Sequence, residues 1–312
     1  MDSDMSGGMV KVMVPASTAN LGPGFDVLGV ALNLYTEISM EFIKDGLEIF
    51  VEGEGVEDIE NDQNNLIYKS AEVIFKKIGV FNKGLRIKIK NEIPLGRGLG
   101  SSAAAIVGGL LAANELTGRV LKREEILNLA ALIEGHADNV TAALNGGLNV
   151  SIFDKNKVYY ARKALEDDID FLAFVPQEMV RTEIARKVLP EKVDFNDAVF
   201  NTGRTAFLVS VLIEKKYELL KIATQDMLHQ KYRAKLVPFM EECFEKALLA
   251  GAYAAFLSGA GPTIMAISSP ENSERVLKEV GKVYEERGLS YRAYRLKCEN
   301  NGAQVLKTPS FV

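Results

Sequence analysis

Pro94-Leu-Gly-Arg-Gly-Leu-Gly-Ser-Ser-Ala-Ala104 is the stretch that decides the fold of this chain. It follows an alternating run at residues 85–90, typical of a half-exposed strand, and it leads into an apolar run at 101–116 with the length of a helix. Its three glycines permit positive φ and let the backbone approach a ligand, and its two serines stand where the helix begins and free N–H groups favour an anion. The sequence predicts a phosphate-binding loop; the alternative is a glycine-rich turn with a serine cap.

The loop is neither a Walker loop, because the Lys-Ser/Thr ending is missing, nor the dinucleotide fingerprint. Two further segments accompany it: Pro15-Ala-Ser-Thr-Ala-Asn-Leu-Gly-Pro-Gly-Phe-Asp26 and Leu257-Ser-Gly-Ala-Gly-Pro-Thr263. In the first, we expect a strand to end at the proline and a polar loop to hold Asn20 and Asp26, as substrate ligands or as an Asx-turn or helix cap. The second reads as a tight link between two strands.

These three segments, in this order, resemble the three motifs of the GHMP kinases (galactokinase, homoserine kinase, mevalonate kinase and phosphomevalonate kinase), and they span most of the chain. The resemblance implies a two-domain α+β GHMP kinase fold. It implies a ribosomal-protein-S5-like α/β domain at residues 1–165, which carries the phosphate loop, and a ferredoxin-like domain at 166–312, which completes the substrate pocket.

Periodicity and turn residues agree with this division, which we place near 164–168, where Glu166-Asp167-Asp168 breaks the apolar pattern. The second half reads as strand–helix–strand–strand–helix–strand with extra helices after the first strand, which is the ferredoxin-like order. The expected strands are 10–14, 27–33, 37–42, 47–51, 85–90, 147–153, 158–162, 171–175, 253–257, 263–267 and 291–297. The expected helices are 65–78, 101–116, 123–134, one near 183, 204–220, 235–249 and one capped by Ser273.

The bulk composition is that of a globular protein: 312 residues, 47% hydrophobic, 25% charged, with a net charge of −5. The sequence has no stripe of basic residues of the kind that binds nucleic acid. No apolar run reaches the ~18 residues of a membrane span. Two cysteines and a polar start over residues 1–8 without signal-peptide features predict a cytoplasmic protein. The sequence leaves open the role of that start and the oligomeric state, a homodimer included.

A fourth segment, Glu134-Gly-His-Ala-Asp-Asn139, follows an apolar helix. The resemblance implies that Glu134 is a Mg²⁺ ligand together with Ser102. One carboxylate and one hydroxyl suffice, because Mg²⁺ keeps water molecules and nucleotide phosphates as its other ligands. The alternative is that Glu134 merely ends a helix. Asp138 and Asn139 are the catalytic candidates, expected to touch the acceptor hydroxyl. Phosphoryl transfer depends chiefly on positioning and electrostatics, so we assign no general base.

The His-Ala-Asp-Asn form is that of the family members that act on L-homoserine, whereas mevalonate kinases carry Ser-Gly-Val-Asp. The resemblance therefore implies phosphorylation of the L-homoserine side-chain hydroxyl by ATP, in threonine biosynthesis. Another GHMP small-molecule kinase, of the mevalonate or phosphomevalonate type, and a catalytically silent metabolite sensor are the alternatives. The substrate residues implied are Asn20, Asp26, His136, Thr182, Arg186 and Arg233.

Arginine suits the substrate carboxylate because its planar fork matches a carboxylate bidentately, although lone arginines on helices are usually solvated. Asp26 is expected to face the substrate ammonium. Asn65, at a helix start, resembles the position that touches adenine, or it caps the helix. The residues expected to bind ATP are Asn65, Pro94, Leu95, Gly96, Arg97, Gly98, Leu99, Gly100, Ser101, Ser102, Ala103 and Ala104.

Overall fold

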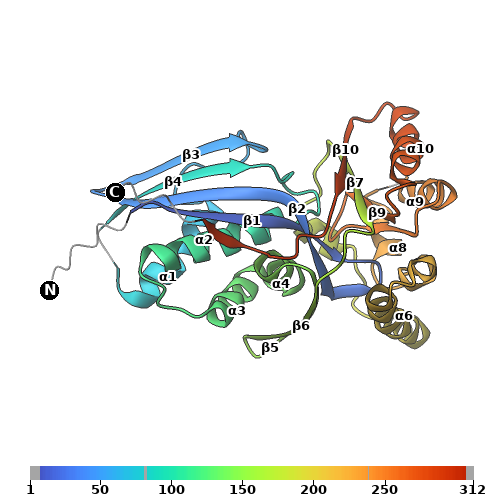
Figure 1. The fold of residues 1–312 in the computed structure, drawn as a ribbon, viewed down its shortest axis with the longest axis horizontal. Coiled ribbons are helices and arrows are strands. Elements are labelled where there is room, and N and C mark those ends of the chain that lie inside the picture. Colours follow the sequence, from blue (N-terminus) through green and yellow to red (C-terminus); the bar gives the residue numbers. More distant parts are fainter. Residues whose placement is uncertain (1–7, 81–82, 238, 307–312) are drawn as a thin grey trace.

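The computed structural model describes residues 8–80, 83–237 and 239–306, and Figure 1 shows two α+β units side by side. Most of the polar start of the chain, residues 1–7, lies outside the described residues. Each unit consists of one sheet with helices packed on it, as the resemblance to the GHMP kinases predicted.

The first unit is built on a seven-stranded sheet of order β11-β1-β2-β4-β3, with β5 paired to β2 and β6 to β5. Its strands are β1 Val10–Asn20, β2 Gly24–Ile43, β3 Leu47–Gly53, β4 Gly84–Asn91, β5 Leu148–Asp154, β6 Lys157–Lys163 and β11 Gln304–Leu306. Helices α1 Leu66–Ile78, α2 Ser101–Leu116, α3 Arg123–Glu134 and α4 Asp138–Asn145 lie on one face of this sheet (Figure 1).

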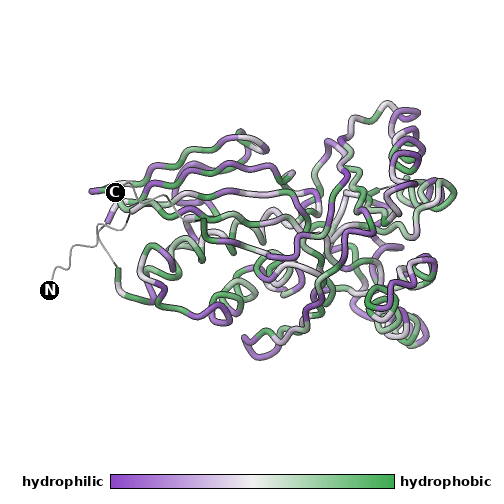
Figure 2. Tube along the Cα trace, viewed as in Figure 1, coloured by the Kyte–Doolittle hydropathy of each residue, from purple (hydrophilic) through white to green (hydrophobic). Residues whose placement is uncertain are grey.

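Helix α2 is the central helix of this layer, and most of its length is buried. A Cβ on Gly108 would lie 2.2 Å from Ile38 Cδ1, and one on Gly109 would lie 2.4 Å from the Ile67 carbonyl oxygen. These two glycines therefore let α2 approach both the sheet and α1 closely. Strand β4 shows the expected alternation, visible as alternating colours in Figure 2. The strand–loop–helix junction is thus held by a well-packed core.

The first motif differs from its predicted structure. Strand β1 continues beyond Pro15 to Asn20, because its ladder with β2 is irregular between Pro15 and Ala16, where the missing proline N–H is tolerated. The runs predicted at 27–33 and 37–42 form one strand, β2. Asn20 therefore ends a strand and Asp26 lies within the next one, and the polar loop predicted to hold both is absent.

The second unit has a four-stranded antiparallel sheet of order β10-β7-β9-β8, which confirms the ferredoxin-like pattern. Its strands are β7 Asp170–Pro176, β8 Ala254–Leu257, β9 Ile264–Ser268 and β10 Tyr291–Leu296. Its helices are α5 Thr182–Lys187, α6 Phe195–Glu214, η1 Tyr217–Leu219, α7 Leu220–Ala223, α8 Gln230–Arg233, α9 Met240–Leu249 and α10 Ser273–Glu285.

Several predicted boundaries in this half were wrong. The helix predicted at 204–220 begins at Phe195 and ends at Glu214. The helix predicted at 235–249 begins only at Met240, as α9, and the short helix α8 before it was not predicted. Asn272, not Ser273, is the N-cap of α10, because the Ser273 hydroxyl donates instead to Asp170 at 2.6 Å. Helix α4 and strand β11 were not predicted.

Strand β11 pairs with β1, so the last described residues return to the first sheet. The division of the chain near residue 165 remains a prediction. The structure adds that β11, which follows the second unit in the sequence, belongs to the sheet of the first. No helix among the described residues combines the length and apolar character needed to cross a membrane.

Candidate active site

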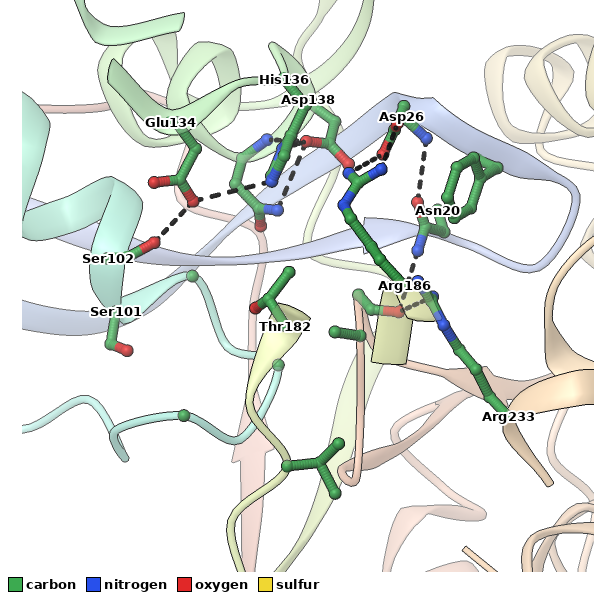
Figure 3. Close-up of a pocket in the computed structure, with 18 residues that line it drawn as sticks. Asn20, Asp26, Ser101, Ser102, Glu134, His136, Asp138, Thr182, Arg186 and Arg233 are labelled. Atoms are coloured by element: carbon green, nitrogen blue, oxygen red, sulfur yellow. Dashed lines mark hydrogen bonds and ion pairs between the residues drawn. The ribbon is translucent and has the colours of Figure 1, made fainter. Parts of the chain in front are cut away.

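A cavity lies between the two units, and residues from both line it (Figure 3). The β1–β2 region, the glycine loop and the start of α4 contribute from the first unit. Helices α5 and α8 and the β8–β9 link contribute from the second. Nearly all the polar residues singled out in the sequence meet here: Asn20, Asp26, Ser101, Ser102, Glu134, His136, Asp138, Asn139, Thr182, Arg186 and Arg233.

The glycine loop is fixed by contacts with the protein itself. Gly98 has φ 80° and Gly100 has φ 70°. A Cβ on Gly98 would lie 2.2 Å from the Ser258 carbonyl oxygen, and one on Gly100 would lie 2.0 Å from Ser17 Oγ. The Ser258 hydroxyl also donates to the Gly98 carbonyl at 2.6 Å. Ser258 belongs to the third motif, so that motif is both a strand link and the support of the loop.

The N-terminus of α2 faces the cavity without a side-chain cap. Its N-cap is Gly100, so the predicted alternative of a serine cap is not realised. Because no side chain occupies the first N–H groups of this helix, they and the positive end of the helix dipole remain available to an anion. The geometry suits a phosphate group held at this end of the cavity.

Ser102 and Glu134 form a close pair of oxygen atoms beside this helix start. The Ser102 hydroxyl donates to Glu134 Oε1 at 2.5 Å. Burial raises the pKa of Glu134, although the positive charge of His136 partly opposes this shift. A partly buried carboxylate whose closest hydrogen-bond donor is a neutral hydroxyl is suited to a cation, and oxygen ligands are those that Mg²⁺ prefers. The donor set therefore fits Mg²⁺.

The histidine segment forms a chain of polar contacts at the start of α4. His136 Nδ1 lies 2.6 Å from Asp138 Oδ1, which also accepts the Asn139 backbone N–H at 2.8 Å. Burial alone would lower the pKa of His136, but the hydrogen bond and charge of Asp138 raise it above its ordinary value. The Asn139 side-chain oxygen accepts a hydrogen bond from Ser17 at 2.8 Å. Asp138 and Asn139 are thus held rigidly at the cavity wall.

Asp26 and Arg186 form a bidentate ion pair across the cavity, with N–O distances of 2.7 and 3.0 Å (Figure 3). Asp26 has a φ of 58° and donates its backbone N–H to the Asn20 side-chain oxygen at 3.1 Å. Asn20 in turn donates to the Gly259 carbonyl at 2.9 Å. The prediction gave these two side chains separate substrate groups, whereas in this structure they bind each other.

Arg233 is a buried cation, with 2% of its surface exposed. Nε donates to the Ala185 carbonyl at 3.1 Å, and Nη1 donates to the Gly259 carbonyl at 2.9 Å. No carboxylate pairs with it within the described residues. Burial, aided by the charge of Arg186, lowers the pKa of Arg233 to about 10. The Phe25 ring lies between the two guanidinium groups, at 5.4 Å from Arg186 and 5.3 Å from Arg233. This end of the cavity therefore favours an anion.

Not every predicted ATP-binding residue faces the cavity. Arg97 turns away from it and donates to the carbonyl oxygens of Leu95, Pro176 and Gln177 at 2.8, 3.0 and 2.5 Å, so its expected phosphate contact has no support. Four other members of the loop are buried: Pro94, Leu99, Ala103 and Ala104. The polar and glycine positions of the loop line the cavity, and the apolar ones anchor it.

Asn65 lies in a second cavity that shares Ser101 and Ser102 with the first. It caps α1: its side-chain oxygen accepts the N–H groups of Ile67 and Tyr68 at 2.9 and 3.2 Å. The cap explanation is therefore confirmed. The contact with adenine stays a prediction, although the same side chain lines this neighbouring cavity.

Sequence reasoning missed Phe25 and Val180, which line the cavity, and Ser17 and His229, which contact residues that line it. Phe25 and Ser17 lie inside the first motif, and their place in it was the available signal. His229 contacts Arg233 Nη1 through Nδ1 at 3.2 Å. It is one of two histidines in the chain.

Comparisons with known proteins bear directly on this arrangement. The family model of the GHMP kinases N terminal domain matches residues 65–147, and that of the GHMP kinases C terminal matches residues 208–286. The chain belongs to the GHMP kinase family. Curated relatives of this GHMP kinase include homoserine kinases of Clostridium beijerinckii, 44% identical over 96% of this chain and 99% of theirs, and of Caldicellulosiruptor saccharolyticus, 45% identical over 97% and 98%.

Solved structures agree. A homoserine kinase of Cytophaga hutchinsonii superposes with a TM-score of 0.86 at 28% identity, covering 98% of this GHMP kinase and 99% of that chain. A mevalonate kinase of L. major, with R-mevalonate, has a TM-score of 0.72 at 18% identity, covering 94% and 96%, and so shows the shared fold alone. The two-domain α+β fold predicted from the motifs is confirmed.

Proposed function

We propose that this protein is an ATP-dependent homoserine kinase, which transfers a phosphoryl group to the side-chain hydroxyl of L-homoserine and forms O-phospho-L-homoserine for threonine biosynthesis in the cytoplasm. The observation that carries the proposal is the layout of the cavity. An anion-favouring pair of arginines lies at one end, the open N-terminus of α2 lies at the other, and Asp138 and Asn139 line the wall.

ATP is assigned to the α2 end and to the second cavity. The phosphates would accept hydrogen bonds from the first N–H groups of α2 and from the loop glycines. The base would enter the second cavity beside Asn65, whose walls include the apolar side chains of Ile59, Leu66 and Leu95. The shared residues Ser101 and Ser102 link the two cavities, so a single nucleotide can span both.

Mg²⁺ would be held by Ser102 and Glu134 together with nucleotide phosphates and water. When bound, the ion supplies positive charge that offsets the charge of the phosphates. The chain itself holds the carboxylate beside the helix start, and the 2.5 Å contact with Ser102 orients it.

The amino acid is assigned to the arginine end. Its carboxylate would bind Arg233, which has no anionic partner among the residues that the structure describes, with Arg186 and Thr182 beside it. Its ammonium would bind Asp26, with Asn20 and His136 completing the pocket. Because Asp26 and Arg186 bind each other in this structure, a zwitterion can take a place between them and satisfy both charges.

The hydroxyl of the amino acid would lie near Asp138 and Asn139. Asp138 already accepts from His136 and from the Asn139 N–H, so both side chains are held in fixed positions rather than free to follow a substrate. Transfer of a phosphoryl group depends mainly on such positioning and on charge. The site therefore needs no dedicated strong base.

The test is a substrate panel with ATP and Mg²⁺ and with products identified by mass. L-homoserine should give a phosphorylated product, and mevalonate and phosphomevalonate should not. Phosphorylation of mevalonate without that of homoserine would overturn the proposal. ATP binding without product from any substrate would instead indicate a silent sensor, which the intact Ser102–Glu134 pair argues against.

A further inference from the structure

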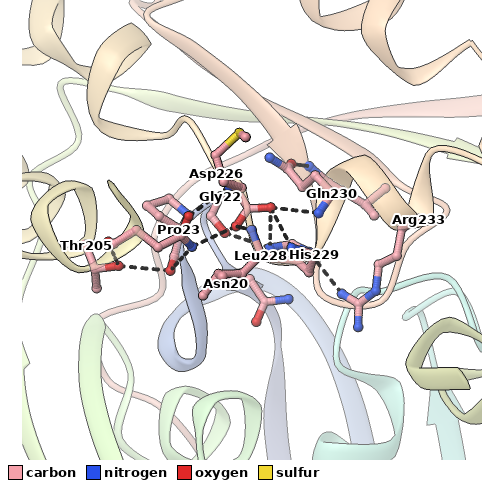
Figure 4. A network of polar contacts seen from close by, with 12 residues as sticks. Asn20, Gly22, Pro23, Thr205, Asp226, Leu228, His229, Gln230 and Arg233 are labelled. Carbon is pink, nitrogen blue, oxygen red and sulfur yellow. Dashed lines mark hydrogen bonds and ion pairs between the residues drawn. The ribbon is translucent and has the colours of Figure 1, made fainter. Parts of the chain in front are cut away.

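His229 is buried, yet it does not line the cavity, and the proposed chemistry does not use it. Its ring lies beside the Arg233 guanidinium, and the two are joined by a dashed line in Figure 4. Nε2 lies 2.7 Å from the Gly22 carbonyl oxygen, and Nδ1 lies 3.2 Å from Arg233 Nη1. The ring therefore connects the β1–β2 turn to a side chain of the substrate pocket.

The two contacts determine the protonation of the ring. A carbonyl oxygen only accepts hydrogen bonds, so Nε2 carries the hydrogen. A guanidinium only donates, so Nδ1 is the unprotonated acceptor. Burial lowers the pKa of His229, which agrees with a neutral ring. His229 is thus a neutral acceptor aimed at a cation.

Arg233 is left with one free edge as a result. Its Nε is used by the Ala185 carbonyl, and its Nη1 by the Gly259 carbonyl and by His229. Nη2 has no hydrogen bond within the described residues, while Arg233 lines the cavity. Because these three acceptors engage Nε and Nη1, Nη2 is the nitrogen left for a ligand in the cavity. Arg233 is therefore expected to contact a carboxylate through Nη2 alone, and not bidentately as predicted from the sequence.

The histidine itself is fixed by a buried polar network. Asp226 accepts the backbone N–H groups of His229 and Gln230 at 2.9 and 2.7 Å, and the Asn201 side chain at 2.8 Å (Figure 4). Asn201 also donates to the Pro23 carbonyl at 3.2 Å. These contacts tie α6, the start of α8 and the β1–β2 turn together, so the ring has little freedom to leave Arg233.

We propose that His229 is a positioning residue of the substrate site, which orients Arg233 through its Nδ1 acceptor so that Nη2 binds the carboxylate of the amino-acid substrate. This role rests on the proposed function. It predicts that substitutions of His229 which remove the acceptor weaken binding of the substrate carboxylate. Binding of ATP and of the amino alcohol part of the substrate should stay largely unchanged.

Two substitutions separate the two ring nitrogens. In His229→Asn the amide oxygen can take the place of Nδ1 and keep the acceptor for Arg233. In His229→Gln the amide reaches the place of Nε2 and keeps the donor to Gly22 but loses the acceptor. Thr205→Val is the matched control, because Thr205 donates to the Pro23 carbonyl of the same turn at 2.9 Å without contacting Arg233.

The measurement compares L-homoserine with 3-aminopropan-1-ol, which lacks the carboxylate, as substrate or as competitive inhibitor. A hydrogen bond to a charged group corresponds to roughly a tenfold to hundredfold change in binding. We expect His229→Gln to raise the KM for homoserine by that factor, with the affinity for aminopropanol and the KM for ATP nearly unchanged. His229→Asn should restore most of the homoserine affinity, and Thr205→Val should change only the melting temperature.

Equal effects of His229→Gln on homoserine and aminopropanol, or no effect on either, would overturn this role while the wild type still phosphorylates homoserine. A wild type that forms no phosphohomoserine would overturn the proposed function itself. Should His229→Gln fail to fold, His229→Asn decides the matter, because it keeps the acceptor for Arg233 and loses the donor to Gly22. Near-normal homoserine binding by a folded His229→Asn protein supports the role. A raised KM for homoserine in that protein, with normal aminopropanol binding, would overturn it.

Discussion

Replacing Arg233 by alanine removes the buried cation that we assign to the substrate carboxylate. The side chain is 2% exposed and has no carboxylate partner within the described residues, so a bound carboxylate would be its main counter-charge. Truncating one partner of a buried, hydrogen-bonded charge pair costs about 2–5 kcal/mol, or about 30-fold to 5,000-fold in kcat/KM. We expect a loss in this range for L-homoserine.

The substitution also removes the Arg233 donor of the Ala185 carbonyl oxygen, whereas the Gly259 carbonyl oxygen keeps the Asn20 amide as a donor. A buried acceptor that loses its partner costs about 1–3 kcal/mol unless water replaces the donor. The melting temperature of the variant should therefore fall, and kinetics must be measured where the variant remains folded. Arg233→Lys should recover only part of the activity, because lysine keeps the charge but not the planar set of donors.

The assay is steady-state kinetics with each substrate varied while the other is saturating. Arg204→Ala is the control: Arg204 stacks on the Phe200 ring at 3.4 Å and bonds to Gln225, outside the cavity. Arg233→Ala should raise the KM for homoserine far more than that for ATP, and Arg204→Ala should change neither. Equal weakening of both substrates by Arg233→Ala would refute the carboxylate assignment.

Three further predictions concern the metal site, the phosphate loop and stability in acid. Glu134→Gln keeps the shape of the carboxylate but removes its charge, and should raise the Mg²⁺ concentration for half-maximal turnover by about tenfold or more; an unchanged Mg²⁺ curve would contradict the role. Gly98→Ala forces a Cβ to within 2.2 Å of the Ser258 carbonyl oxygen and should abolish ATP binding in a calorimetric titration. Gly118→Ala, at a similar positive φ with nothing within 4 Å, should cost only about 1–2 kcal/mol of stability. Burial alone would raise the pKa of Asp170, but the hydrogen bonds from Lys297, Ser273 and Arg295 outweigh it and lower that pKa below 3.8. The ionised carboxylate therefore stabilises the fold above this pH, and the stabilisation is lost as the pH falls below it. Asp170→Asn should make the melting temperature less dependent on pH in acid.

The fold could be predicted where local pattern and tertiary packing agree. Strand β4 alternates, and helix α3 begins and ends at the predicted residues. The pattern failed where tertiary pairing overrides local signals. Pro15 reads as the end of a strand, but the irregular ladder with β2 lets β1 continue, and the three-residue strand β11 carries too little pattern to predict.

The site could be predicted as a set of residues but not as a set of contacts. The motifs placed Asp26, Arg186 and Arg233 in one pocket, and the structure does bring them together. Sequence patterns carry residue types and spacing but not orientation. They could not show that Arg97 turns to backbone carbonyl oxygens, nor that Asp26 and Arg186 bind each other.

The structure also changes the physical meaning of the glycine loop. The glycines were expected to let the backbone approach a ligand. At position 98, however, only glycine fits because any Cβ would lie 2.2 Å from the Ser258 carbonyl oxygen of the second unit. Ser258 also shares a hydrogen bond with Thr18 of β1 at 2.8 Å, and the Gly259 N–H donates to the Ala19 carbonyl. The phosphate end of the cavity is therefore held in shape by the same β8–β9 link whose Gly259 carbonyl binds Asn20 and Arg233 at the substrate end. A shift of this one link would alter both ends together, which makes it the structural connection between the two substrate sites.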